Sequence, residues 1–123
     1  MKKYIGLFLS LIVGLLLVTG CEKVESGNYK EGTYFGSATS TSSGTTSVTT
    51  TVVYVNENGM IKSVFIDNAY TKDKVLSTKK ALGAAYGMKA KSEVGKEWYE
   101  QANLIEAKVI ENQGTTFTII IPQ

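Results

Sequence analysis

The 123-residue chain contains no histidine and no arginine, and it has only one cysteine and one proline. The absence of histidine excludes a Ser-His-Asp or Cys-His nucleophile, a histidine-bound zinc and imidazole base catalysis. A lone cysteine also excludes an intramolecular disulfide. The carboxylates are scattered singly instead of being spaced as a metal loop or a catalytic pair, so we predict no metal site and no catalytic residue. Any redox chemistry would therefore be carried by a cofactor.

The formal charge of +2 comes from the first residues of the chain. Lys2 and Lys3 account for it, because the rest of the sequence has 11 lysines and 11 acidic residues. Nucleic-acid binding needs a basic patch or stripe as its electrostatic footprint. We therefore predict no nucleic-acid partner.

Residues 1–20 have the layout of a secretory signal, with Lys2 and Lys3 ahead of an uncharged run that ends at Cys21. The last residues of this run, Val18-Thr19-Gly20-Cys21, resemble a bacterial lipobox. In such a signal the cysteine sulfur is diacylated, and a lipoprotein signal peptidase then removes the segment before the cysteine. Two acyl chains anchor a protein stably. We predict a lipid anchor on Cys21 and a location on the extracellular face of the cell membrane.

Two alternatives for this segment stay open. The uncharged run is close to the roughly 20 apolar residues that a membrane-spanning helix needs, so it is also compatible with a retained membrane helix. Cys21 is also compatible with a small buried hydrophobe or a free thiol. Its position at a polar boundary, directly before Glu22 and Lys23, favours lipidation over either.

The sequence after the signal divides into a short tether and one small domain. Residues 21–31 are polar and lack periodicity, which predicts a tether. Residues 32–123 have the length of a single domain. They begin with β-prone runs and continue with segments of helical spacing, which predicts an α+β fold with a small antiparallel sheet packed with one or two helices.

Two hairpins are predicted in the first half of the domain. The segment 37–51 is rich in serine and threonine without proline, and Gly44 offers a turn within it, so a hairpin is favoured over a mucin-like stalk. Asn58-Gly59 is a strong turn signal, with strands near Ser47–Val55 and Met60–Asp67. A two-residue turn would place Val53, Val64 and Ile66 on one face and Val52, Tyr54, Ile61 and Phe65 on the other. Apolar residues on both faces predict that each is at least partly covered.

Helical spacing dominates the second half. One stripe predicts a helix near Glu93–Gln113 that ends before Gly114, with Trp98 as its largest core residue. The stripe consists of Val94, Trp98, Ala102, Ile105 and Val109. A short helix is predicted over Asp73–Leu82, stopping at Gly83, and a final strand is predicted over Thr115–Ile121, closed by Pro122.

The segment from Lys79 to Asn112 resembles the FMN-binding domain family, in particular Gram-positive surface lipoproteins that carry flavin for extracellular electron transfer. The similar residues are Leu82-Gly83, Tyr86-Gly87-Met88-Lys89, Glu97-Trp98, Gln101 and Glu106. The runs "EGTYFGSA" and "VYVNENGMIKSVFID" resemble the family's first strand and its central hairpin. The resemblance covers about residues 29–114 and implies FMN as cofactor and a membrane electron donor as partner.

One family motif is absent from this sequence. Family members carry Asp-x-x-Ser-Gly-Ala-Thr after the tryptophan helix, and a flavin transferase esterifies its threonine to FMN phosphate. Asp67 and Asp73 are the only aspartates here, and neither begins such a motif. We therefore expect FMN, if bound, to be held without a covalent link.

The resemblance implies a flavin site at Tyr86, Gly87, Met88, Lys89 and Trp98. Aromatic rings stack on an isoalloxazine, and a glycine permits close approach of the backbone. The structural alternative is that Trp98 fills the core and that Tyr86-Gly87-Met88 is a tight turn beneath it. Lys89, Lys91 and Lys96 are candidates for phosphate contact, although isolated lysines are more often solvated.

The leading interpretation is a lipid-anchored electron carrier or non-catalytic scaffold with an FMN-binding-type domain, in preference to an enzyme. One alternative is a non-redox surface lipoprotein, including a precursor whose signal peptide is released as a pheromone. Another is a truncated remnant of a longer flavoprotein, with a domain that is incomplete at its C-terminus.

Overall fold

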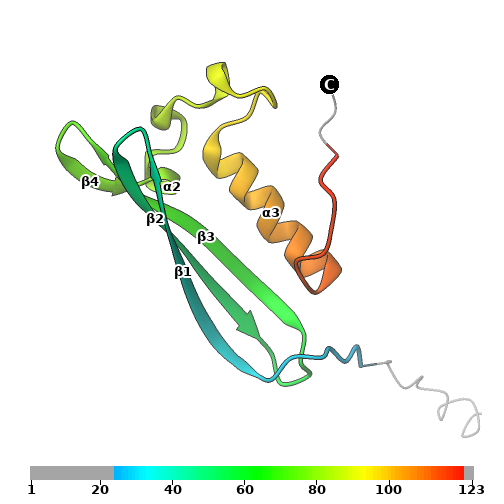
Figure 1. Ribbon diagram of the computed structural model, residues 1–123. Coiled ribbons are helices and arrows are strands. Elements are labelled where there is room, and N and C mark those ends of the chain that lie inside the picture. The colour runs from blue at the N-terminus through cyan, green and yellow to red at the C-terminus, as the bar shows by residue number, and fades with distance from the viewer. Residues whose placement is uncertain (1–23, 121–123) are drawn as a thin grey trace, which may run out of the picture.

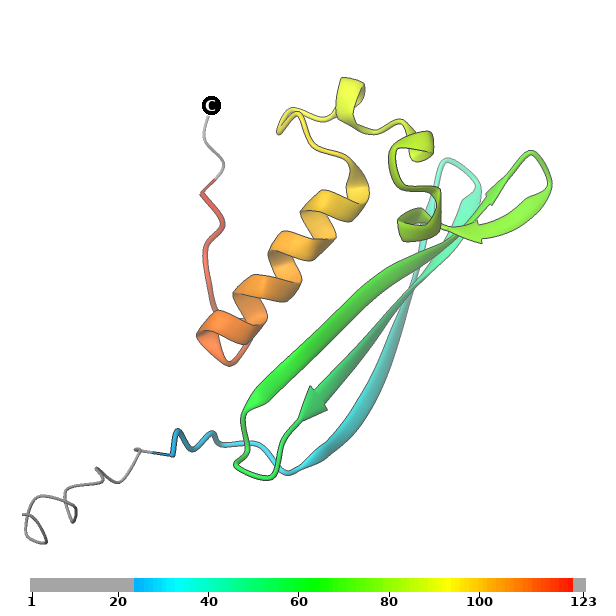
Figure 2. The same ribbon diagram turned by 180° about the vertical axis from the view of Figure 1, so that it is seen from behind.

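The computed structural model describes residues 24–120, which form a four-stranded antiparallel sheet and two α-helices (Figures 1 and 2). The strand order is β1-β2-β3-β4, so each strand pairs with its neighbour in sequence. The longer helix, α3, lies along β3, as both views show. The predicted α+β class, with a small antiparallel sheet packed with one or two helices, is confirmed.

Strands β1 (Gly32–Ser42) and β2 (Thr45–Val55) form the first hairpin. Ser43 and Gly44 form its turn with positive φ angles, as expected for a tight hairpin. The predicted hairpin at Gly44 is thus confirmed, with β2 starting two residues earlier than expected. Strand β3 (Ile61–Lys72) follows the Asn58-Gly59 turn and extends five residues beyond its predicted end.

A β-bulge near the second turn changes the expected faces of the sheet. Tyr54 pairs with Ser63 and Val55 with Ile61, so Lys62 is an extra residue on β3. Because side chains alternate along a strand, the extra residue moves Ile61 to the other face. The prediction that placed Ile61 beside Phe65 was wrong, and Ile61 is instead buried against Val55.

Within residues 24–120 the two faces of the sheet are covered to different extents. The buried residues Val55, Ile61 and Val64 pack with Val109 of α3 and form the core cluster. On the opposite face Phe35, Tyr54 and Phe65 stay 71%, 43% and 47% exposed. Val52 on this face is part-buried, and the Lys80 ammonium lies 4.4 Å from the Phe65 ring centroid, so the expectation that each face is at least partly covered is confirmed, with much weaker cover on this face.

Helix α3 (Trp98–Asn112) is shorter than predicted at its start. Glu97 caps it in a capping box, in which its side chain accepts from the backbone of Glu100 and the Glu100 side chain accepts from the Glu97 N–H at 2.7 Å. This box and the left-handed Gly95 begin the helix at Trp98 instead of Glu93. The end before Gly114 is confirmed. Trp98 itself is half-buried and lies outside the core cluster, so its prediction as the largest core residue was wrong.

The segment predicted as a helix over Asp73–Leu82 contains a turn, a strand and a single helical turn. Asp73 and Lys74 have positive φ angles and close a hairpin between β3 and β4 (Val75–Thr78). Helix α2 (Lys79–Leu82) begins only there, because the Thr78 side chain caps it by accepting from the Ala81 N–H. Its predicted stop at Gly83 is confirmed.

The N-terminal end of the described chain contacts the second hairpin and the end of α3. Gly27 and Tyr29 donate backbone hydrogen bonds to the carbonyls of Asn58 and Gly59, and a Cβ at Gly27 would collide with the Gly59 carbonyl. The Tyr29 hydroxyl donates to the Gln113 carbonyl at 2.9 Å. This part of the predicted tether is thus fastened to the domain.

After α3 the chain runs back alongside the helix (Figures 1 and 2). Thr115–Ile120 form no strand, so the predicted strand was wrong over these residues. The physical reason is that α3 and the Gln113 side chain occupy the edge of β3 that a further strand would join. Residues 121–123 lie outside the described part. Between residues 24 and 120 no helix is long and apolar enough to cross a membrane.

Candidate functional site

The loop between α2 and α3 carries four of the five residues predicted to contact flavin, and the fifth, Trp98, is the first residue of α3. The loop contains two short 3-10 turns, Gly83–Tyr86 and Lys89–Lys91, separated by the left-handed Gly87. The buried carboxylate of Glu97 accepts from the Met88 N–H at 2.9 Å. The Gln101 side chain donates to the Ser92 hydroxyl and to the Lys96 carbonyl. The first turns of α3 therefore hold this loop in place.

Aromatic rings and a lysine meet at the start of the loop. The rings of Tyr70 and Tyr86 pack edge to face, with centroids 5.0 Å apart. The Lys79 ammonium lies 5.1 Å from the Tyr86 ring centroid and 5.4 Å from that of Trp98. Both distances are within the range of a cation–π interaction. Lys79 thus links two rings that are 12 residues apart in sequence.

A small pocket of about 200 Å³ opens beside these rings. We call it the loop pocket, and it is lined by Tyr70, Tyr86, Gly87, Met88 and Lys91. Three of the five predicted flavin residues are therefore among its lining residues. Lys89 is exposed and does not line it, and Trp98 is not among its lining residues, although the Lys79 ammonium lies 5.4 Å from the Trp98 ring centroid.

The loop pocket combines an aromatic ring, an open stretch of backbone and positive charge. The Tyr86 ring offers a surface for stacking, and no atom lies within 4 Å of a Cβ built at Gly87, so the backbone is open to a ligand there. Lys79 beside the Tyr86 ring and Lys91 in the pocket lining carry positive charge. Ligand pockets usually measure about 300 to 1,000 Å³, so the loop pocket is smaller than a typical small-molecule site.

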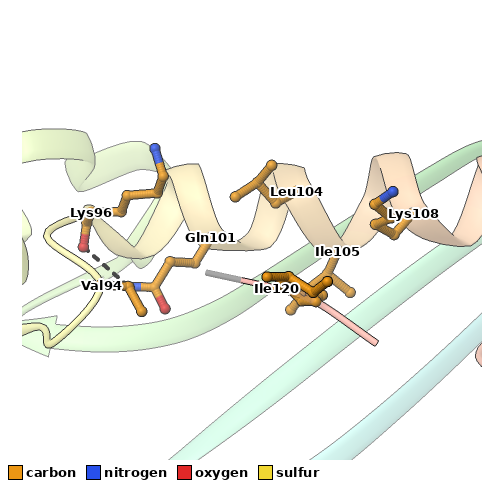
Figure 3. A pocket seen from close by; sticks show the side chains of 8 residues that line it. Val94, Lys96, Gln101, Leu104, Ile105, Lys108 and Ile120 are labelled. Atoms are coloured by element: carbon orange, nitrogen blue, oxygen red, sulfur yellow. Dashed lines mark hydrogen bonds between the residues drawn. The ribbon is translucent and has the colours of Figure 1, made fainter. Parts of the chain in front are cut away.

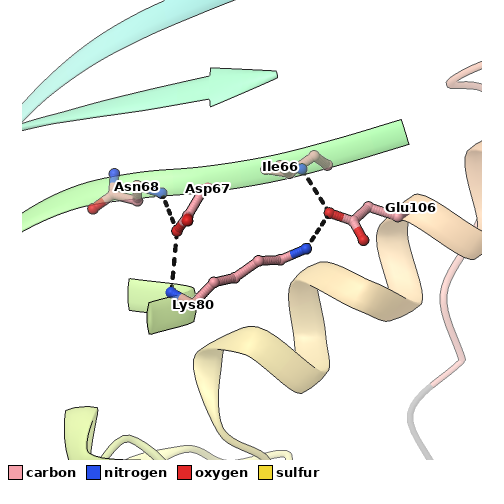
Figure 4. Close-up of polar contacts among 5 residues, drawn as sticks. All are labelled: Ile66, Asp67, Asn68, Lys80 and Glu106. Atoms are coloured by element: carbon pink, nitrogen blue, oxygen red, sulfur yellow. Dashed lines mark hydrogen bonds and ion pairs between the residues drawn. The ribbon is translucent and has the colours of Figure 1, made fainter. Parts of the chain in front are cut away.

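A cluster of polar side chains fixes the position of α2 (Figure 4). The Asp67 carboxylate accepts from the backbone N–H groups of Asn68 and Lys80. The Lys80 ammonium forms an ion pair with Glu106 at 2.5 Å, and the same Glu106 oxygen accepts from the Ile66 N–H at 2.6 Å. Because Lys79 is next to Lys80, this cluster also places Lys79 beside Tyr86.

A second and larger opening lies between α3 and the chain segment that follows this helix (Figure 3). We call it the α3 groove, and it measures about 400 Å³. Its lining residues are Val94, Lys96, Gln101, Leu104, Ile105, Lys108, Ile119 and Ile120. Lys96, a candidate for phosphate contact, lies here and not at the loop pocket.

Sequence reasoning missed Tyr70 and Lys79. Tyr70 lies in the part of β3 beyond its predicted end, and Lys79 lay within a segment predicted as continuous helix. No local pattern indicates that either residue lies near Tyr86. Cys21, the predicted lipidation site, lies outside the described residues.

The chain was compared with models of protein families, with curated proteins and with solved structures, and none of them matches it.

Proposed function

We propose that the protein is anchored by lipid on Cys21 to the extracellular face of the cell membrane, and that its domain binds FMN without a covalent link at the loop pocket. The lipobox-like end of the apolar run supports the anchor. One observation carries the flavin proposal, namely that Tyr86 and the open backbone at Gly87 lie beside the Lys79 ammonium. This combination offers a stacking surface, close backbone approach and a cation for phosphate.

Each residue has a distinct part in binding. The Tyr86 ring stacks on the flavin ring, and Tyr70 holds Tyr86 in place through its edge-to-face contact. Stacking displaces the Lys79 ammonium from the Tyr86 ring, after which Lys79 and Lys91 are available to the phosphate. FMN, when bound, supplies the electron transfer that no side chain of this sequence can supply.

The affinity is expected to be weak. The loop pocket is small, and no covalent phosphoester offsets the translational and rotational freedom that the ligand loses. We expect a dissociation constant on the order of micromolar or poorer. Co-expression of residues 21–123 with a flavin transferase should leave the intact mass unchanged under denaturing conditions, and a gain equal to FMN would contradict this.

Fluorescence titration with FMN tests the flavin site. Residues 21–123 contain every element of the described fold. Tyr86→Ala should weaken binding by about two- to tenfold, because an aromatic contact contributes about 0.5 to 1.5 kcal/mol. Lys79→Met should also weaken it by removing the charge while keeping the side-chain length.

Tyr54→Ala and Lys62→Met are matched controls, since both residues are exposed on β2 and β3. They should leave FMN binding unchanged. Absence of saturable quenching at any accessible concentration would reduce the domain to a scaffold without flavin. Equal weakening by the controls would place any binding elsewhere.

The anchor has its own test. Cells given radiolabelled palmitate should label the wild-type chain and not a Cys21→Ala variant, which should also keep its signal. Label in the Cys21→Ala variant would contradict the assignment of the lipid to this sulfur.

A non-redox surface lipoprotein is the second candidate function. The α3 groove favours it, because this opening of about 400 Å³ has no aromatic ring among its lining residues on which a flavin could stack.

A further inference from the structure

The α3 groove has the size and lining of a site for a flexible apolar ligand. Its volume of about 400 Å³ falls within the range of about 300 to 1,000 Å³ that is usual for small-molecule sites. The apolar lining residues are all aliphatic, with no aromatic ring among them. Leu104 and Ile105 of α3 are 44% and 37% exposed, and Ile120 is 87% exposed. An alkyl chain would cover these side chains better than a planar ring.

The charged residues of the α3 groove are two lysines. Lys96 and Lys108 lie on either side of Leu104 (Figure 3). Lys108 forms an ion pair with Glu111, and both side chains are well exposed. Lys96 belongs to neither of the two ion pairs that the structure describes for residues 24–120. The groove therefore combines an aliphatic interior with a positive rim.

We propose that the α3 groove binds a free anionic amphiphile with a single alkyl chain, that is, a fatty acid. The alkyl chain lies along Leu104, Ile105 and Ile120, where apolar surface is removed from water. The carboxylate contacts the Lys96 ammonium, which gains a charge-assisted hydrogen bond. Charge complementarity thus favours an anion over a neutral or cationic amphiphile of the same length.

Calorimetric titration of residues 21–123 tests both parts of this proposal. The ligands are decanoate, dodecanoate and dodecyltrimethylammonium, each below its critical micelle concentration. Each added methylene should tighten binding about three- to fourfold, so dodecanoate should bind about tenfold or more tighter than decanoate. Dodecyltrimethylammonium should bind at least several-fold more weakly than dodecanoate.

Variants on the rim should alter the charge preference. Lys96→Gln should weaken dodecanoate binding several-fold and leave dodecyltrimethylammonium binding little changed. Leu104→Glu should weaken dodecanoate binding and reduce the preference for the anion, because it removes an apolar contact and adds a carboxylate at the groove. Lys62→Gln, an exposed lysine of β3, is the control and should change neither. Far-UV circular dichroism checks that each variant folds.

Four outcomes would overturn the proposal. The first is the absence of saturable binding, and the second is equal affinity for the anion and the cation. The third is a dimer that forms without ligand and that Leu104→Glu dissociates, because a second copy then occupies the groove. The fourth is binding to anionic lipid vesicles, lost in Lys96→Gln, without binding of free dodecanoate, because the groove is then a membrane contact.

Discussion

The two sides of α3 differ in the kind of contact that they make with the rest of the domain. The side that faces β3 carries directional polar contacts, in which Glu106 accepts from the Ile66 N–H and Gln113 both accepts from and donates to the backbone of Ile61. Ala102 and Val109 are buried on this side. The other side carries Leu104 and Ile105, which stay partly exposed along the α3 groove.

This difference shows how the helix is held in place. Strand β4 pairs with β3 only from Ala69 onward, so the edge of β3 before that residue has no strand partner. Backbone groups at such an edge need other hydrogen-bond partners or water. Glu106 and Gln113 supply two of them at separate points, which fixes the position of α3 along the strand. Aliphatic contacts are not directional, so the side chains on the groove side do not fix the position of α3 along the strand.

The largest effect is expected from Glu106→Ala. This change leaves the Lys80 ammonium and the Ile66 N–H without their shared partner, and both side chains of the ion pair are mostly buried. Breaking a buried pair costs about 3 to 5 kcal/mol, and we expect about 3 kcal/mol here because both side chains keep some exposure. Urea unfolding followed by circular dichroism measures the loss.

Glu111→Ala is the matched control, because it breaks an exposed ion pair on the same helix. It should cost less than about 1 kcal/mol. Glu106→Gln should fall between the two, since an amide oxygen can still accept both hydrogen bonds. If Glu106→Ala and Glu111→Ala cost the same, the contrast between the two sides of α3 is lost.

A smaller effect is expected from Gln113→Ala. The Gln113 amide forms two hydrogen bonds with Ile61, at 2.7 and 3.0 Å. Each such bond contributes about 0.5 to 1.5 kcal/mol, so the loss should be about 2 kcal/mol. Comparison of Gln113→Gly with Gln113→Ala measures the backbone strain at this position, because Gln113 has a φ of 51° that glycine adopts freely. Wild-type stability in Gln113→Ala, which keeps the strained backbone, would assign no role to the amide.

Elements with local signals were predictable from the sequence. The turns at Gly44 and at Asn58-Gly59 and the helix end at Gly83 follow from glycines with positive φ angles. The left-handed cap of α3 is Gln113, the residue before Gly114. These signals involve neighbouring residues only, and tertiary packing did not override them.

Elements that depend on distant contacts were not predictable. The bulge at Lys62 reverses the face of Ile61, and no local pattern indicates it. Asp73 and Lys74 adopt positive φ angles that non-glycine residues rarely adopt, so a helix was the natural expectation there. The ion pair that joins α2 to α3 spans 26 residues, and charge alone did not reveal it.

The residues of the candidate sites also divide into those with a local sequence signal and those brought together by distant contacts. Tyr86, Gly87 and Met88 are consecutive and were found through a motif, whereas Tyr70 and Lys79 reach the loop pocket from other elements. The α3 groove was missed because its residues Val94 and Ile105 were assigned to the core stripe. Helical spacing identifies a common stripe but does not say which part of it is covered.

Trp98→Ala measures how far the core extends toward the loop. A core tryptophan replaced by alanine would cost about 3 to 5 kcal/mol. Trp98 is half-buried and lies outside the core cluster, so we expect about 1 to 2 kcal/mol from the apolar area that is lost. Thermal or urea unfolding decides between these values. A loss of 3 kcal/mol or more would place Trp98 with Val109 in the core.

The smallest effect is expected from Leu104→Gln, on the groove side of α3. Leu104 is 44% exposed, and exposed substitutions usually change stability by less than about 0.5 kcal/mol. Ala102→Gln places the same side chain on the β3-facing side, where Ala102 is 4% exposed, and overpacking there should cost at least about 1 to 3 kcal/mol. Alanine, leucine and glutamine are all good helix formers, so helix propensity cannot account for the difference. Urea midpoints for the two variants give the comparison directly. A loss above about 2 kcal/mol in Leu104→Gln would mean that the groove is filled in solution, and a fatty acid could then enter only by displacing what fills it.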